Sequence, residues 1–217
     1  MKWRALATDF DGTIATDAVV DEPTLAALGR LRSANVRTLL VTGRHLTDFE
    51  PMGSFLALFD MVVGENGAVL FEPANGTFRT LSPPPPKEFV DELSRRQVTP
   101  LGVGHSIVDT REPHHITVLE VIKEQGLELE IIFNKGAVMI LPSGVNKASG
   151  LQAALQALGL SPETVIGVGD AENDHAFLEI CGLPVGVANA VPALKTKAEV
   201  VTQHSAGAGV TELIESA

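Results

Sequence analysis

“ATDFDGT”, residues 7–13, joins the end of an apolar run to two aspartates, Asp9 and Asp11, that stand one residue apart. The run itself, residues 3–8, is strand-sized and nearly continuous in hydrophobicity, as in a strand that is covered on both faces. Two neighbouring carboxylates repel each other, and neither has a basic neighbour in this stretch. The stretch therefore predicts a buried strand with an acidic site at its carboxyl end.

Further strand-sized apolar runs follow along the chain at residues 37–41, 61–63 and 164–168. Helical patterns lie between these runs. Residues 21–36 predict a helix with Asp21 as its N-cap, and residues 146–159 predict another with Asn146 as N-cap and Gly159 as the C-terminal stop. Alternating strands and helices favour an α/β fold, with a doubly wound parallel sheet as a Rossmann-like core.

Four consecutive prolines in “SPPPP”, residues 82–86, interrupt the alternation of strands and helices. Stacked prolines make a stiff, extended connector because they fix φ and cannot continue a helix. The residues that follow predict helices at 87–97 and 113–125, a strand at 101–109, and a strand pair at 127–133 and 136–142 that is tightly linked. We therefore expect a Rossmann-like catalytic core at residues 1–82 and 143–217, and an inserted α+β unit at residues 83–142.

The composition limits the classes of partner. The 217 residues contain 16 Lys and Arg against 27 Asp and Glu, a net charge of −11 that disfavours binding to nucleic acids and anionic membranes. The single cysteine, Cys181, allows no internal disulfide and fits a reducing compartment. No run approaches the ~20 apolar residues of a membrane span, and the first residues lack a segment of signal-peptide length. We expect a cytoplasmic protein that binds neither nucleic acid nor membrane.

Polar residues gather at the carboxyl ends of the predicted strands, where open α/β sheets bind ligands. Four separate segments supply these residues. The first contributes Asp9 and Asp11, the second Thr42, Gly43 and Arg44, the third Lys147, and the fourth Asp170, Asn173 and Asp174. Several oxygen donors close together require a cation, and oxygen-only ligation suits Mg²⁺. The lysine and the hydroxyl fit a phosphate beside a carboxylate nucleophile, and Gly12 and Gly43 would let backbone amides approach its oxygens.

These residues form four motifs, “DFDGT” at 9–13, “VTGR” at 41–44, Lys147, and “GDAENDHAFL” at 169–178. In this order they resemble the motifs of the haloacid dehalogenase superfamily of phosphohydrolases, over essentially the whole chain. The insert between the second and third motifs, together with “GENGA” at 64–68, resembles the Cof-like subgroup. That subgroup also contains sucrose-phosphate, mannosyl-phosphoglycerate and phosphoglycolate phosphatases.

The resemblance implies a role for each motif residue. Asp9 would be the nucleophile that forms an aspartyl-phosphate, and Asp11 would be the general acid and base. Mg²⁺ would bind a side-chain oxygen of Asp9, the backbone carbonyl of Asp11 and a carboxylate oxygen of Asp170, with Asp174 as a further ligand or a support behind them. The residues that hold the phosphoryl group would be Thr42, Gly43, Lys147 and Asn173.

The resemblance also implies that the insert closes over the core as a cap and selects the leaving group. Titratable and basic candidates in the stretch “HSIVDTREPHH” are His105, Arg111, His114 and His115. Further substrate candidates in the core are Arg44, Glu65 and Asn66. A surface salt bridge is the alternative for Arg44, a structural turn is the alternative for “GENG”, and an exposed helix start is the alternative for the paired histidines.

The leading hypothesis is thus a Mg²⁺-dependent phosphatase that acts on a small phosphorylated metabolite, either a sugar phosphate or a phosphoglycolate-like acid. A phosphomutase shares the aspartyl-phosphate and is the nearest alternative. A phosphoacceptor signalling domain also combines an acceptor aspartate, a threonine and a lysine, but it should be shorter and uncapped. A non-catalytic binding protein on the same fold is the third alternative. No residue pattern specifies an oligomeric state.

Overall fold

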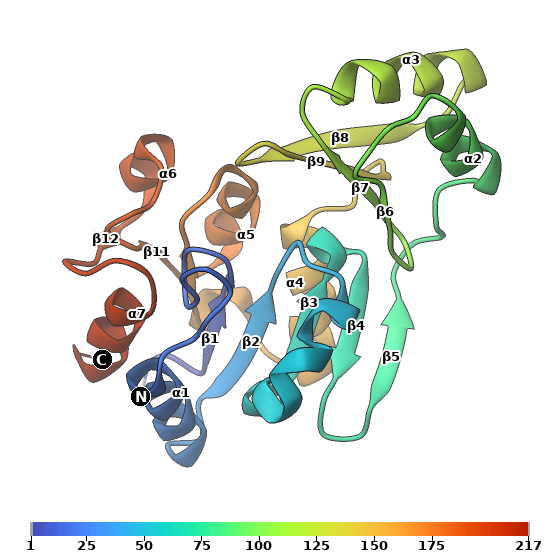
Figure 1. Cartoon of the computed structure of the whole chain (residues 1–217). Coiled ribbons are helices and arrows are strands. Elements are labelled where there is room, and N and C mark those ends of the chain that lie inside the picture. Colours follow the sequence, from blue (N-terminus) through green and yellow to red (C-terminus); the bar gives the residue numbers. More distant parts are fainter. Residues whose placement is uncertain (1, 217) are drawn as a thin grey trace.

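A computed structural model describes residues 2–216 and contains one large and one small β-sheet (Figure 1). In this part of the chain the large sheet has eight strands, in the order β12-β11-β10-β1-β2-β3-β4-β5. The strands are β1 (Ala5–Thr8), β2 (Arg37–Val41), β3 (Met61–Gly64), β4 (Val69–Glu72), β5 (Thr77–Thr80), β10 (Val165–Gly169), β11 (Leu183–Gly186) and β12 (Val200–Val201). The pairs β3–β4 and β4–β5 are antiparallel, and all the other pairs are parallel.

Helices cover both faces of the large sheet (Figure 1). They are α1 (Glu22–Ser33), α4 (Lys147–Leu158), α5 (His175–Ile180), α6 (Pro192–Lys197) and α7 (Ala206–Ser216). Helix α1 packs against α7 on one face, and α4 packs against α5 on the other. This arrangement confirms the predicted doubly wound α/β fold. Between residues 2 and 216, no helix combines the length and the apolar character needed to cross a membrane.

The predicted N-caps fix where two helices begin. The side chain of Asp21 accepts the N–H of Thr24 at the start of α1. Asn146 accepts the N–H groups of Ala148 and Ser149, while the Ser149 hydroxyl accepts the N–H of Asn146, so that a full capping box starts α4. Lys147 is therefore the first helical residue of α4, which sets the position of its side chain.

The small sheet belongs to a second unit that has its own hydrophobic core. Among the described residues its strand order is β6-β7-β9-β8, and all its pairs are antiparallel. Its elements are α2 (Lys87–Arg95), β6 (Gly102–Val103), β7 (Val108–Arg111), α3 (His115–Gln125), β8 (Leu129–Asn134) and β9 (Ala137–Pro142). The domain boundaries at 83 and 142 remain a prediction, although these elements all fall between them.

Two local features differ from the sequence-based expectations. The strand expected at 101–109 is divided into β6 and β7, because the turn between them is held by hydrogen bonds to the buried carboxylate of Glu65. The hairpin β4–β5 was not expected, although “NG” at 75–76 is a typical hairpin signal. A 3₁₀ segment of 13 residues lies at Leu46–Leu58, and short ones lie at Glu65–Gly67, Pro162–Thr164 and Glu172–Asp174.

The sheet topology brings the motif segments to one edge. Thr8, the last residue of β1, pairs with Leu40 of β2 on one side and with Val168 of β10 on the other. The three parallel strands therefore end at the same level, so the loops after them meet. The start of α4 reaches the same edge because Gly67, at a φ of 105°, packs against the carbonyl of Asn146, where any side chain would overlap.

Candidate active site

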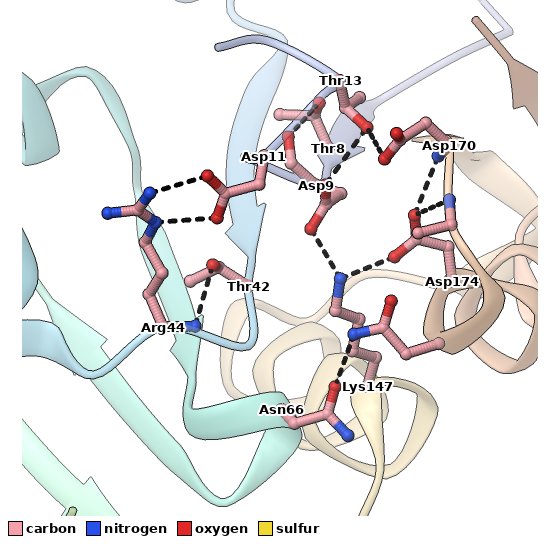
Figure 2. Close-up of polar contacts among 12 residues, drawn as sticks. Thr8, Asp9, Asp11, Thr13, Thr42, Arg44, Asn66, Lys147, Asp170 and Asp174 are labelled. Carbon is pink, nitrogen blue, oxygen red and sulfur yellow. Dashed lines mark hydrogen bonds and ion pairs between the residues drawn. The ribbon is translucent and has the colours of Figure 1, made fainter. Parts of the chain in front are cut away.

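A buried lysine between two buried aspartates forms the centre of the site (Figure 2). Lys147 donates from Nζ to Asp9 Oδ1 at 2.5 Å and to Asp174 Oδ1 at 2.6 Å. The side chain of Lys147 is only 1% exposed, and a charge is buried to this degree only when it is paired. The loop after β1, the start of α4 and the loop after β10 are therefore joined at one point.

Asp170 completes an oxygen-rich cluster beside this lysine. The hydroxyl of Thr13 lies 3.2 Å from Asp9 Oδ2 and 3.1 Å from Asp170 Oδ1, so it bridges the two carboxylates. One ligand oxygen from each of Asp9, Asp170 and Asp174 lies within 4.8 Å of the other two. Buried oxygen donors of like charge at this spacing fit a divalent cation such as Mg²⁺. Asp174 also orders the loop, because its Oδ2 accepts the N–H groups of Asp170 and Ala171.

Negative charge exceeds positive charge in this cluster. Burial and the neighbouring Asp174 raise the pKa of Asp9 to about 7, although Lys147 opposes the shift. The pKa of Asp170 is also raised, mainly by burial. Burial disfavours the ammonium form of Lys147, but Asp174 and Asp9 outweigh it and raise the lysine pKa. The lysine thus stays charged, while a bound cation would neutralise the remaining negative charge.

Asp11 points away from the cluster, toward the loop that follows β2 (Figure 2). Arg44 holds its carboxylate in a fork, with Nε 2.7 Å from Oδ2 and Nη2 2.7 Å from Oδ1. The backbone N–H of Arg44 in turn donates to the buried hydroxyl of Thr42 at 3.1 Å. In this structure the side chain of Asp11 therefore faces Arg44, and it lies outside the carboxylate cluster.

Two asparagines border the site near the loop after β2. Asn173 Nδ2 donates to Asn66 Oδ1 at 3.0 Å, and both side chains are buried. Their other polar atoms, Asn66 Nδ2 and Asn173 Oδ1, have no hydrogen-bond partner among the described residues. A Cβ at Gly43 would lie 3.8 Å from Asn173 Nδ2 and 3.2 Å from the sulfur of Met139 in β9. Gly43 and Asn173 are thus neighbours beneath the second unit.

Glu65, which the sequence suggested as a substrate residue, is used to hold the second unit. Its carboxylate is fully buried and accepts the backbone N–H groups of His105, Ser106 and Ile107, at 3.0, 2.8 and 3.3 Å. His105 Nδ1 also lies 3.0 Å from Glu65 Oε1. Both residues therefore belong to a core-to-insert contact in this structure.

Among the described residues, no ion pair joins the other candidates of the insert to the carboxylate cluster, whereas a lysine that the sequence analysis did not name contacts it. Arg111 is exposed at the end of β7, and no hydrogen bond or ion pair of its side chain is found in the described part of the chain. His114 and His115 start α3, with His115 3.8 Å from Glu112. Lys135, in the turn between β8 and β9, places its Nζ 2.5 Å from Asp170 Oδ2.

A further contact joins the two units next to Arg44. His45 Nε2 lies 2.6 Å from Asp109 Oδ1 of β7, and the His45 side chain is 18% exposed. The hydrogen bond to Asp109 raises the pKa of His45, although burial opposes the shift; Glu65 and Asp48 add smaller contributions in the same direction. The protonated imidazole therefore stabilises the observed placement of the second unit.

We expect this contact to depend on pH. Because the pKa of His45 is higher in the folded than in the unfolded state, its stabilisation is complete below the unfolded pKa and is lost as pH rises through the folded one. His45→Gln should lower the free energy of unfolding by about 1 kcal/mol at about pH 5.5 and by much less at about pH 8.5. Denaturant unfolding at both pH values measures this, and an equal loss at the two would contradict the assignment.

Comparisons with known proteins agree on the class of protein that this fold and site define. The profile of the haloacid dehalogenase-like hydrolases matches residues 6–99 and 118–214. The chain therefore belongs to this family, and it is an enzyme of the phosphatase type.

Two archaeal relatives align over almost their full length, and both are named phosphoglycolate phosphatase. That of Methanosarcina acetivorans is 30% identical over 220 residues, which cover 99% of this chain and 96% of the relative. That of Methanothermobacter thermautotrophicus is 32% identical over 220 residues, which cover 97% of this chain and 97% of the relative. Among solved structures, a haloacid dehalogenase-like hydrolase from Bacteroides thetaiotaomicron has a TM-score of 0.84 at 18% identity, over 99% of both chains. A subclass IIB sugar phosphatase has a TM-score of 0.80 at 18% identity, over 98% of both.

Proposed function

We propose that this enzyme is a Mg²⁺-dependent phosphatase that hydrolyses a small phosphorylated metabolite, with phosphoglycolate-like acids first among the candidates. One observation carries the proposal, namely the buried cluster in which Lys147 joins Asp9 to Asp174 beside Asp170. The names of the two archaeal relatives support the choice of substrate.

In the proposed reaction Asp9 is the nucleophile. One of its carboxylate oxygens attacks phosphorus, the bond from phosphorus to the leaving oxygen breaks, and Asp11 donates a proton to that oxygen. A water molecule then attacks the aspartyl-phosphate while Asp11 takes its proton, so that phosphate leaves and both aspartates return to their first states. In the structure the Arg44 fork holds Asp11 as a carboxylate that points away from the cluster (Figure 2), so the proposed proton transfer requires Asp11 to leave this fork and turn toward Asp9.

The phosphoryl group would lie at the loop after β2. Its proposed ligands are Thr42, Gly43, Lys147 and Asn173. The lysine is charged and immobile, which makes it a preorganised partner for charge that develops on phosphoryl oxygens. The buried atoms Asn66 Nδ2 and Asn173 Oδ1, which have no hydrogen-bond partner among residues 2–216, lie at the same border of the site. Asn66 would thus act by positioning Asn173.

Mg²⁺ would be held by Asp9, the backbone carbonyl of Asp11 and Asp170. Asp174 would support these ligands without binding the ion itself, because its oxygens already accept hydrogen bonds from Lys147 and from the backbone of the loop after β10. When bound, the ion supplies positive charge that screens the phosphoryl oxygens from the attacking carboxylate. The second unit, residues 83–142, would be the cap that covers the site and excludes water.

The direct test is a phosphate-release assay over phosphoglycolate, a set of sugar phosphates and nucleotides, with Mg²⁺ and with a chelator. We expect Mg²⁺-dependent release that falls by at least about 100-fold in the chelator, because the excess negative charge of the cluster then opposes the approach of phosphate. Release that is equal in the chelator would contradict the metal assignment, and release from none of the compounds would contradict the phosphatase assignment.

A further inference from the structure

Lys135 is the cation of the second unit that reaches the acidic cluster. Its Nζ lies 2.5 Å from Asp170 Oδ2, and a Cβ at Gly12 would lie 3.0 Å from the same atom. The ammonium thus sits between the loop after β1 and the loop after β10. Figure 1 shows the turn end of the β8–β9 hairpin extending over this edge of the large sheet. Asp170 is fully buried, whereas the side chain of Lys135 is 49% exposed, so this lysine joins the buried cluster to the solvent.

The backbone at Lys135 is unfavourable for a lysine. Lys135 has a φ of 48° and Gly136 a φ of 82°, so both central residues of this two-residue hairpin turn are left-handed. Such turns favour Asn, Asp or Gly at the first position, because a longer side chain is strained there. Strained positions of this kind concentrate where the side chain has a function. The lysine is thus better explained by what its side chain contacts than by the needs of the turn.

The other cations of the site each have more than one hydrogen bond to a carboxylate. Lys147 joins Asp9 to Asp174, and Arg44 holds Asp11. Lys135 is different, because the single carboxylate that it contacts among residues 2–216, Asp170, would hold Mg²⁺, whereas Lys147 keeps Asp174 as a partner when Asp9 binds the ion. A dication on Asp170 would repel the ammonium from it, which leaves a flexible, half-exposed positive charge beside the cluster.

Three other cations of the second unit are placed by their contacts. The register partner of Arg111 is Ala137, which puts Arg111 near the same hairpin turn, although no ion pair of its side chain is found among residues 2–216. Lys87 pairs with Asp91 on α2, and Arg96 contacts Glu92 and Glu124. No ion pair between another cation of this unit and the carboxylate cluster is found among residues 2–216. Lys135 is therefore the cation of this unit whose contact with the cluster is observed, and it is the first candidate to recognise an anionic leaving group.

We propose that Lys135 binds a carboxylate of the leaving group, so that the site selects phosphate esters of small 2-hydroxy acids over esters of neutral alcohols. This inference rests on the proposed phosphatase function and adds the residue that recognises the second anionic group. Lys135 acts on substrate binding, and proton transfer remains with Asp11.

The variant for the test is Lys135→Asn, since asparagine suits the left-handed turn and should leave the unfolding midpoint unchanged or higher. Hydrolysis of phosphoglycolate is compared with that of ethyl phosphate, which lacks the carboxylate. We expect kcat/KM for phosphoglycolate to fall about 30-fold, mainly through KM, because a charge-assisted hydrogen bond is lost. For ethyl phosphate the change should stay within about threefold. Lys123→Gln, on the exposed side of α3, is the matched control and should leave kcat/KM unchanged for both phosphoglycolate and ethyl phosphate.

Binding to an inactive chain gives a second readout that does not require turnover. In an Asp9→Asn background with Mg²⁺, calorimetric titration with phosphoglycolate should show affinity that is about 30-fold weaker when Lys135→Asn is added. Equal losses for both esters, or unchanged binding in the titration, would overturn the proposal, as would failure of the parent to bind phosphoglycolate. Absence of phosphate release from the native chain concerns the proposed function instead, and in that case the titration alone decides the role of Lys135.

Discussion

Asp9→Asn is expected to reduce phosphate release by about 10⁴-fold while the fold is kept. An amide oxygen is too weak a nucleophile to form the bond to phosphorus, and the substitution also removes a charge that would face Mg²⁺. The shape of the side chain is preserved, and Lys147 still has Asp174 as a partner at 2.6 Å. The variant should therefore unfold at close to the native midpoint, and kcat, measured with saturating Mg²⁺, should account for most of the loss.

The matched control is Asp91→Asn on α2, which makes the same chemical change on an exposed side chain that pairs with Lys87. Its activity should stay within about twofold of the native value, because surface ion pairs contribute little. An acid-quenched native enzyme should retain labelled phosphate that Asp9→Asn does not. If Asp9→Asn kept more than about a tenth of the activity, covalent catalysis by this residue would be refuted.

The fold could be predicted because its signals are local. Asp21 and Asn146 are polar residues just before apolar periodic stretches, and both cap helices as expected. The strands at 37–41 and 164–168 are short apolar runs, and the structure places β2 and β10 within one residue of them. The division of the 101–109 segment could not be predicted in this way, because the cause is a carboxylate, Glu65, that lies about forty residues earlier in the chain.

The same difference between local and distant signals decides which site residues could be predicted. The core motifs indicated which residues meet, since they follow adjacent parallel strands, and the structure brings Asp9, Lys147, Asp170 and Asp174 together. The insert offered no such rule. Histidines drew attention in the sequence because they are titratable, yet the side chain that reaches the cluster is Lys135. A signal was present, because a lysine before glycine in a tight link between two strands is unusual, but only the register of β8 and β9 shows that the two residues form the turn.

Lys147→Met should be the most destabilising of these substitutions and should also remove activity. The variant keeps the length and apolar stem of the side chain but leaves Asp9 and Asp174 buried, adjacent and without their common partner. Breaking a buried ion pair by deleting one partner costs about 3–5 kcal/mol. Denaturant unfolding followed by the fluorescence of the single tryptophan, Trp3, which packs against the core of the large sheet, would measure this loss.

Mg²⁺ should partly reverse that loss, and this response separates a charge effect from a packing defect. A dication bound by the carboxylates replaces some of the missing positive charge, so Mg²⁺ should raise the unfolding midpoint of Lys147→Met more than that of the native chain. Lys197→Met removes an exposed lysine paired with Glu179 and should cost less than about 1 kcal/mol, with no special response to Mg²⁺. If Lys147→Met were as stable as Lys197→Met, the ammonium would not be what makes the buried carboxylate cluster tolerable, and the assignment of Lys147 as its central cation would fail.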